Sequence, residues 1–593
     1  MTAERRLRPA SQRDRPYSRV VIESVSPEVD GGRFPIKRTV GEEVAVSADI
    51  FADGHDVIVP VLRHRCLGAK DWTEVPMNLS TNDRWTGKFT VTAQGWHEYT
   101  IEAWVDRFAS WHKELGKRHE SGQQELTSEL LEGAALIGEG AGRATDVDAD
   151  WLQQRADVLR STTSQAERVQ LALDAELAER MARYPDRGGA CAYDRTLHIM
   201  VERERARFGA WYEMFPRSAS TDRGRHGTLR DVVARLPYVA EMGFDVLYLP
   251  PIHPIGRAFR KGPNNTLTPG PDDPGSPWAI GGPEGGHKAI HPELGTLDEF
   301  DHLVSTAREM GLEIALDIAF QCSPDHPYVR EHPEWFRHRP DGTIKYAENP
   351  PKKYQDIYPL DLECDDWNAL WNELRDVFLF WIGHGVSIFR VDNPHTKPFR
   401  FWDWVIKEVW DRHPDTIFLS EAFTRPKLMR RLAKGGYSQS YTYFTWRNTK
   451  RELTDYLAEL TQSDSAEYMR GNLFANTPDI LHEFLQVGGR PAFMIRLVLA
   501  ATLSASYGIY GPPFEHCIGT PLRAGSEEYL DSEKYQISHW DVDVQWSLRD
   551  YIARINEIRR DNSALQANRN LRFFECDNES MIVYGKSTPG HAN

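Results

Sequence analysis

The sequence predicts an α/β protein centred on a (β/α)8 TIM barrel, because four apolar segments in its second half each end in polar side chains. Each segment is short and rich in β-branched or aromatic residues, as buried parallel strands are. The polar residues stand at the carboxyl end, where a β/α barrel carries its chemistry. The segments are EIALDIAFQC (313–322), VSIFRVDNPH (386–395), TIFLSEAF (416–423) and NLFANTPD (472–479).

Two smaller domains are expected ahead of the barrel. Residues 1–17 are Arg-rich without an apolar stretch, which predicts a disordered basic tail and not a secretory signal. Residues 18–115 hold short strand-like runs between Gly, Asp and Asn turns, a spacing that predicts an immunoglobulin-like β-sandwich. Residues 116–207 place apolar residues at helical spacing between charges, which predicts a small helical insertion domain.

The barrel itself is expected over residues 208–560. A helical pattern over 228–243 runs into an apolar strand at 244–251, and strands and helices then alternate. Residues 323–366 are irregular and rich in Pro, Asp and Tyr, so we expect an inserted subdomain over the site. Residues 561–593 hold about two strands, too few to bury a sheet face, and predict a partial, apparently truncated C-terminal β domain.

Charge and cysteine usage narrow the partners and the compartment. Lys and Arg number 71 and Asp and Glu 87, so the net charge is 71 − 87 = −16. Such a surface repels nucleic acid and anionic membranes, and neither is expected as a partner. The six Cys are scattered, which disfavours structural zinc and a disulfide framework and favours the cytoplasm. The chain also lacks an EF-hand-like loop, so no metal and no cofactor is expected.

The second strand-like segment pairs a cation with an acid. Arg390 and Asp392 are two residues apart on a strand, so both side chains point to the same face, which in a barrel is the rim of the lumen. A guanidinium beside a carboxylate favours the ionised form, as a glycosyl nucleophile requires. A structural Arg–Asp pair explains this segment equally well.

Two further acids complete a glycosidase-like constellation. Glu421, in FLSEAF, stands at the end of the next predicted strand. A carboxyl group that faces two others in a dry pocket has a raised pKa, which suits a general acid. Asp479 follows NLFANTP and is placed to bind sugar hydroxyls as the ring distorts. Either acid alone is more often a solvated residue at a strand end. The three acids in this order favour catalysis.

The four segments resemble the four conserved regions of the α-amylase superfamily, glycoside hydrolase family 13. Within it, the chain is more similar to the α-1,4-glucan:maltose-1-phosphate maltosyltransferases of bacterial glucan synthesis. The resemblance spans residues ~18–580. Its most specific strings are WYEMFPRS (211–218), YLPPIHPIGRAFRKGPNN (248–265), QCSPDHP (321–327), AENPPKKYQDIYP (347–359) and SEKYQISHWD (532–541).

This resemblance implies roles for individual residues. It makes Asp392 the nucleophile, Glu421 the proton donor and Asp479 the transition-state stabiliser. It assigns contacts with the donor substrate to Lys261, Gln321, Asp356, Asn393, Lys534 and Tyr535, and Arg390 is added as a substrate-binding residue. Amylases have Asn-His where this chain has Gln321-Cys322, and His where it has Pro478. Both departures agree with the maltosyltransferase pattern.

A sugar phosphate needs cations, and this acidic chain gathers several in segments expected at one rim. They are Lys261, Lys352, Lys353, Arg260 and Lys534. Lysine binds phosphate as a point charge. Tyr354 and Asn349, in the same irregular segment, can add hydrogen bonds. Each lysine alone is more often a solvated surface residue.

The resemblance therefore implies a retaining transfer of a maltosyl unit. The donor would be α-maltose 1-phosphate, the acceptor the 4-hydroxyl at the non-reducing end of an α-1,4-glucan, and phosphate the leaving group. It also implies a homodimer. The alternatives are an α-amylase-like hydrolase or another transglycosylase of the same barrel, and a non-catalytic glucan-binding homologue.

Overall fold

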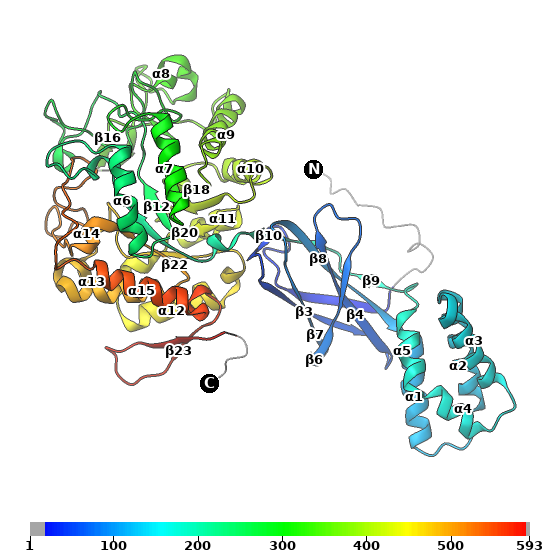
Figure 1. Ribbon diagram of the computed structural model, residues 1–593. Coiled ribbons are helices and arrows are strands. Elements are labelled where there is room, and N and C mark those ends of the chain that lie inside the picture. The colour runs from blue at the N-terminus through cyan, green and yellow to red at the C-terminus, as the bar shows by residue number, and fades with distance from the viewer. Residues whose placement is uncertain (1–17, 351, 589–593) are drawn as a thin grey trace. The chain divides into compact units, whose positions relative to one another are not determined.

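The computed structural model describes residues 18–350 and 352–588, without the side chains of Asn349 and Lys352. The expected disordered tail at 1–17 lies outside these residues. The chain forms two compact units, which divide between Val201 and Glu202. The first unit contains the β-sandwich and helices α1–α5, and the second contains the barrel (Figure 1).

Two antiparallel sheets make up the β part of the first unit. The first has the order β1 (Val20–Ser26), β3 (Glu43–Ala52), β7 (Arg84–Thr90), β6 (Asn78–Thr81). The second has the order β2 (Ile36–Thr39), β10 (Leu197–Glu202), β8 (Gly95–Asp106), β4 (Val57–Cys66), β5 (Thr73–Pro76), and β9 (Cys191–Ala192) joins β8. Strand β3 alternates buried and exposed residues, as a strand with one face in a sandwich core does.

Five helices follow the sandwich strands: α1 (Arg107–Glu120), α2 (Thr127–Arg143), α3 (Asp146–Arg160), α4 (Gln165–Ala172) and α5 (Ala175–Arg183). Two boundaries differ from the expected ranges. Helix α1 begins at Arg107 and not near residue 116, because the Asp106 side chain accepts a hydrogen bond from the Ala109 amide and caps it. Strands β9 and β10 lie inside the range expected to be helical, because they complete the sheet of β8.

The barrel consists of eight parallel strands, and each pairs with the next in chain order except the sixth and the seventh, which stand at the two ends of the hydrogen-bonded order. They are β11 (Gly209–Glu213), β12 (Val246–Leu249), β13 (Glu313–Ile318), β18 (Ile388–Val391), β19 (Ile417–Ser420), β20 (Gln439–Ser440), β21 (Asn472–Phe474) and β22 (Ser506–Tyr510). Strand β22 returns to β11, and a parallel bridge between Ser440 and Gly471 closes the ring. The predicted TIM barrel is confirmed, and all four segments that predicted it supply strands.

Helices surround the barrel strands (Figure 1): α6 (Leu229–Glu241), α7 (Leu297–Glu309), α9 (Trp367–Gly383), α10 (Phe399–Trp410), α11 (Pro426–Lys434), α12 (Lys450–Gln462), α13 (Glu483–Leu503) and α15 (Arg549–Asp561). Capping boxes start α6, α7 and α12 at Thr228, Thr296 and Thr449. Helix α13 has the length and composition of a membrane span, yet it contacts β21, β22 and α15 as a barrel helix.

The irregular segment after β13 forms short pieces above the carboxyl ends of the strands. Strand β14 (Gln321–Cys322) pairs with β17 (Tyr358–Pro359), and β15 (Ala347–Asn349) pairs with β16 (Lys352–Tyr354). Helix α8 (Pro327–Glu331) lies between β14 and β15 in the chain. At the other end of the barrel unit, β23 (Leu571–Phe574) and β24 (Val583–Lys586) form a two-stranded antiparallel sheet.

On four of the barrel strands, the side chains that face the lumen change from apolar to charged between one residue and the next residue on the same face. Trp211, Ala315, Ile388 and Leu419 belong to one buried cluster. Two residues further along the same strands, and therefore on the same face, come Glu213, Asp317, Arg390 and Glu421. A packed apolar layer thus supports a layer of charged side chains at the carboxyl ends of the strands.

Two glycines of α2 should respond oppositely to Ala. A Cβ on Gly133 would lie 1.9 Å from the Trp111 ring, whereas a Cβ on Gly142 would meet nothing within 4 Å. Gly133→Ala should lower the free energy of unfolding by about 1–3 kcal/mol because the core has no room for the methyl group. Gly142→Ala should raise it by up to about 1 kcal/mol through helix propensity. Thermal unfolding of both variants checks this, and equal shifts would contradict the packing.

Candidate active site

One guanidinium holds three buried carboxyl groups together at the carboxyl ends of β13, β18 and β19. Arg390 Nη1 lies 2.9 Å from Asp317 Oδ2 and 2.9 Å from Asp392 Oδ1. Its Nη2 lies 3.2 Å from Glu421 Oε1. Asp317, Asp392 and Glu421 expose 1%, 7% and 9% of their surface and Arg390 5%, so little solvent screens these pairs.

Asn393 connects the two acids that flank the lumen rim. Its backbone N–H donates to Glu421 Oε2 at 3.1 Å, and its side-chain Nδ2 lies 3.3 Å from Asp392 Oδ2. The residue adopts left-handed backbone angles (φ 43°, ψ 50°), which Asn tolerates better than most residues. This turn directs one donor to each carboxyl group.

The pKa values of two of these carboxyls are far above their usual range. Burial, with the negative charges of Asp392 and Asp479, raises the pKa of Glu421 to about 8 although Arg390 opposes the shift. Burial and the charge of Asp392 raise the pKa of Asp317 to about 7, again against Arg390. One arginine cannot neutralise three carboxylates, so protons supply the remaining neutrality. At neutral pH Glu421 is therefore mainly a neutral acid.

Asp317 was missed in the sequence although it lies inside the first of the four segments. It stands opposite Arg390 in the pairing of β13 with β18 and accepts a hydrogen bond from the Tyr248 hydroxyl at 2.5 Å. The signal was available, because Asp317 lies one residue before the end of its strand, as Arg390 does, and Glu421 directly follows its own strand. Glu213 was missed as well. It is 1% exposed, and burial raises its pKa well above the usual range.

Asp479 lies further from Arg390 and binds a lysine instead. Lys534 Nζ forms an ion pair with Asp479 Oδ1, and Asp479 exposes 45% of its side chain. Burial opposes the charge of Lys534, but Asp479 and Asp392 raise its pKa above the usual range. Asp479 is thus the most solvent-accessible of the three predicted acids.

Trp278 brings together residues that are distant in the sequence, and it was not predicted. Lys534 Nζ lies 5.0 Å from the centroid of its ring, and Gln321 Nε2 donates to its carbonyl at 3.2 Å. The Tyr535 ring lies 6.0 Å from Lys534 Nζ, and burial raises the pKa of Tyr535 to about 12. Trp278 belongs to an irregular loop, where sequence periodicity offers no signal.

A second lysine lies deeper, beside an acid. Lys261 is 2% exposed, and its Nζ donates to Gln355 Oε1 at 3.0 Å. Asp356 is 3% exposed, and burial raises its pKa although Lys261 and Lys534 lower it. Tyr354 is half-buried nearby in the chain, whereas Lys353 is exposed. The predicted side chains of Asn349 and Lys352 lie outside the described part of the chain.

Arg260, which the sequence offered as a phosphate cation, has a structural role. Its guanidinium donates to the backbone carbonyls of Gly256, Ile255 and Asp273 at 2.9, 3.1 and 3.1 Å. These bonds hold its own loop together. Irregular backbone needs such donors, and a contact of Arg260 with phosphate stays a prediction.

His287, Cys322 and His326 form a buried group with the composition of a metal site. His287 Nε2 lies 2.9 Å from the Ala319 carbonyl and therefore donates, so its Nδ1 accepts from His326 Nε2 at 3.1 Å. His326 Nδ1 in turn accepts the Tyr328 amide at 3.0 Å. Both nitrogens of each ring are thus used. A metal ion on His326 Nε2 would move the ring proton to Nδ1, but Nδ1 already accepts the hydrogen bond from the Tyr328 amide. The group fits a chain of neutral hydrogen bonds better than a metal ion.

Two family models match the chain. The model described as α-1,4-glucan:maltose-1-phosphate maltosyltransferase, domain N/S, matches residues 18–203. The model described as α-amylase, catalytic domain, matches residues 213–400.

Whole relatives match along most of their length. An α-1,4-glucan:maltose-1-phosphate maltosyltransferase of Chlorobaculum tepidum is 54% identical over 98% of this chain and 88% of the relative. The enzyme of the same name from Myxococcus xanthus is 54% identical over 96% of this chain and 86% of the relative. Among solved structures, an α-amylase from Lactobacillus plantarum has a TM-score of 0.50 and 22% identity, covering 65% of this chain and 87% of that one. That likeness concerns the fold alone.

Removal of the shared guanidinium should cost stability in a pH-dependent way. Arg390→Ala leaves buried carboxyls without a counter-charge and should lower the free energy of unfolding by about 3–5 kcal/mol. The loss should be larger at pH 8 than at pH 5, because the pKa values of Glu421 and Asp317 lie at about 8 and 7 and their protonated forms do not need the arginine.

Unfolding of the barrel at several pH values tests this. Arg230→Ala is the matched control, since Arg230 pairs with Glu299 with 80% of its side chain exposed. Exposed pairs contribute about 0–1 kcal/mol, so this control should change stability little at any pH. A loss for Arg390→Ala that does not vary with pH would contradict the protonation states assigned here.

Proposed function

The chain belongs to the α-1,4-glucan:maltose-1-phosphate maltosyltransferase family, and we propose that Asp392, Glu421 and Asp479 carry out its reaction by double displacement with retention. The enzyme is a glycosyltransferase of the α-amylase superfamily. It transfers a maltosyl unit from α-maltose 1-phosphate to the 4-hydroxyl at the non-reducing end of an α-1,4-glucan and releases phosphate.

The observation that carries the assignment of roles is the different environment of two neighbouring acids. Asp392 and Glu421 share Arg390, but burial raises the pKa of Glu421 to about 8. A pair of carboxyls of which one is ionised and the other protonated is what retaining glycosyl transfer needs. Glu421, whose pKa is raised, is therefore assigned as the acid, and Asp392, which Arg390 binds at 2.9 Å, as the nucleophile.

In the first step, Asp392 attacks the anomeric carbon and the bond from that carbon to the phosphate oxygen breaks. Glu421 gives its proton to the departing oxygen, and Asp392 becomes a β-maltosyl ester. Arg390 stays bound to both carboxyl groups and limits the reorganisation that the change of charge requires.

In the second step, the acceptor 4-hydroxyl attacks the same carbon from the face that phosphate left. Glu421, now ionised, takes the hydroxyl proton, and the bond to Asp392 breaks. Two inversions restore the α configuration. Asp479 would bind sugar hydroxyls more strongly as the ring approaches the oxocarbenium-like state.

Two lysines are placed to receive the phosphate. Lys534 is paired with Asp479 and stacked near Trp278, and Lys261 is buried beside Asp356. Each lysine supplies a point charge to an anion. We assign further donor contacts to Gln321, Asp356, Asn393 and Tyr535, with the half-buried Tyr354 of strand β16.

Assembly and location are also proposals. We propose a homodimer, which size-exclusion chromatography with light scattering would reveal as twice the 67.9 kDa of one chain. We propose the cytoplasm as the compartment, supported by six cysteines that are all free thiols and thus suited to reducing surroundings. Fractionation of the source cells would test the location.

Incubation with maltose 1-phosphate and maltohexaose should release phosphate and lengthen the glucan by two glucose units per turn. Asp392→Asn should lower the rate by at least about 10³-fold, because the amide cannot form the glycosyl ester. Phosphate assay, chromatography of the products and NMR of the new linkage measure this together. Free maltose without lengthening would indicate a hydrolase, no turnover by a folded protein would indicate a glucan-binding homologue, and a β linkage would contradict retention.

The pH profile should report the acid. Since the pKa of Glu421 is raised to about 8, the protonated form that assists phosphate departure is lost as pH rises through about 8, and kcat/KM should fall there. Glu421→Gln should lower kcat/KM by about 10²–10⁴-fold and remove this decline. A basic limb that persists in Glu421→Gln would assign the proton to another group.

A further inference from the structure

Lys534 and Tyr535 stand on a segment that no sheet supports. Residues 536–548 form turns and irregular backbone between α14 (Gly511–Glu515) and α15, as do residues 516–535 apart from one bridge, Pro521 to Tyr529. Barrel strands place Asp392 and Glu421 through backbone ladders, and this segment has none at Lys534. Side-chain contacts must therefore set the position of the lysine.

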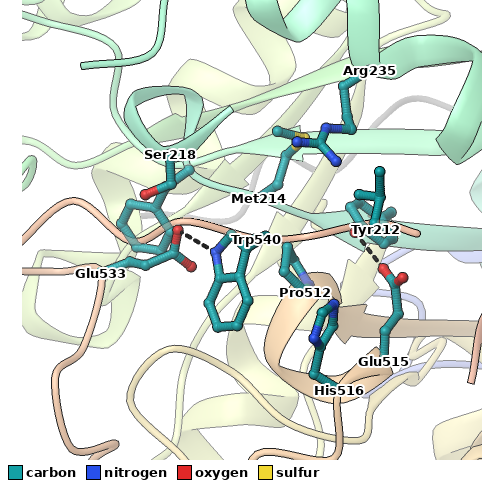
Figure 2. A pocket seen from close by; sticks show the side chains of 11 residues that line it. Tyr212, Met214, Ser218, Arg235, Pro512, Glu515, His516, Glu533 and Trp540 are labelled. Carbon is teal, nitrogen blue, oxygen red and sulfur yellow. Dashed lines mark hydrogen bonds between the residues drawn. The ribbon is translucent and has the colours of Figure 1, made fainter. Parts of the chain in front are cut away.

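Glu533, the neighbour of Lys534 in the chain, supplies those contacts. Its carboxylate is 2% exposed and accepts hydrogen bonds from the Tyr510 hydroxyl and from Trp540 Nε1, the latter at 2.9 Å. Figure 2 shows this carboxylate directed at the indole of Trp540 beside Ser218. Its backbone carbonyl accepts from Arg217 Nε at 3.1 Å and Nη2 at 2.5 Å.

The partners of Glu533 are anchored on the barrel. Tyr510 is the last residue of β22, and Arg217 and Ser218 follow β11. Ser218 Oγ also accepts the Ser538 amide at 3.1 Å, so a second point of the segment is bound to the same place. Burial raises the pKa of Glu533, and three side-chain donors oppose that shift.

We propose that Glu533 is a positioning residue that sets Lys534 against Asp479 and thereby determines affinity for the sugar phosphate. Glu533 lines a cavity with Trp540 and Glu515, while Lys534 pairs with the Asp479 carboxylate and lies near the Trp278 ring. This inference rests on the assignment of Lys534 to the donor phosphate. Glu533 itself touches none of the reacting groups.

The cavity contains a matched control. Glu515 is 1% exposed, lines the same cavity and accepts a hydrogen bond from the Tyr212 hydroxyl (Figure 2). It also accepts one from the Tyr238 hydroxyl. Its neighbour in the chain, His516, has no assigned contact with the donor. Glu515→Gln and Glu533→Gln therefore make the same chemical change in the same cavity. They differ mainly in position, since only Glu533 adjoins Lys534 in the chain.

Kinetics of the two variants test the effect on the donor. Glu533→Gln should raise the KM for maltose 1-phosphate about tenfold and change kcat less than about twofold, since the lysine contacts the phosphate in ground and transition states alike. Glu515→Gln should leave that KM within about twofold of wild type. Equal changes in both variants would reduce Glu533 to a residue of general stability and overturn the proposal.

A double-mutant cycle separates positioning from mere packing. If Glu533 acts through Lys534, Glu533→Gln should add less than about twofold to the KM of Lys534→Ala, whereas independent effects would multiply. Trp540→Phe removes one donor to Glu533 without altering either charge, and it should raise the KM in the same direction by a smaller factor. Multiplying effects would overturn the proposal even if every variant folds.

Amide hydrogen exchange tests the anchor without turnover. Glu533→Gln should speed exchange at least about tenfold at Tyr535 and Ser538, whose amides bind the Ser532 carbonyl and Ser218 Oγ, and Glu515→Gln should not. Unchanged exchange in Glu533→Gln would overturn the proposal whatever the kinetics. If wild-type protein released no phosphate from maltose 1-phosphate, the proposed function would fail, while exchange would still show whether Glu533 holds the segment.

Discussion

The site depends on one buried guanidinium that serves three carboxyl groups. Arg390 binds Asp317, Asp392 and Glu421 at 2.9–3.2 Å in a space almost closed to water. Its single charge cannot neutralise all three, and burial raises the pKa of Asp317 to about 7 and that of Glu421 to about 8. The proposed glycosyl transfer uses the raised pKa of Glu421, because a nucleophile and a proton donor that are both carboxyl groups must differ in protonation state.

The layers of side chains inside the barrel support this cluster of charged residues. Below the charged residues lies an apolar layer that includes Trp211, Ile388 and Leu419, contributed by the same strands two residues earlier. The packed layer excludes water from one side of the acids and fixes the strand ends that carry them. The irregular segments, including the loop with Trp278, bring Lys534 and Gln321 together, two residues that we propose contact the donor.

The sequence was most informative where regular structure places the residues. Strand patterns located Asp392, Glu421 and Asp479, and the resemblance added the donor contacts of Lys261 and Lys534. Periodicity did not identify Asp317 or Glu213. Asp317 lies near the end of its strand, but periodicity alone does not show that it stands opposite Arg390 on the neighbouring strand. The hydrogen bonds of Arg260 to its own loop and the contacts of Trp278 were missed, since loop backbone decides both.

Asn393 gives the site a further property. One peptide in a left-handed conformation directs its amide to Glu421 and its side chain to Asp392. The proposed acid and the proposed nucleophile therefore cannot be tuned separately at this point, because any rotation of that peptide moves both hydrogen bonds at once. Laboratory evolution of new donors or acceptors would have to leave this hinge between the acids intact and find its variation in the loops above.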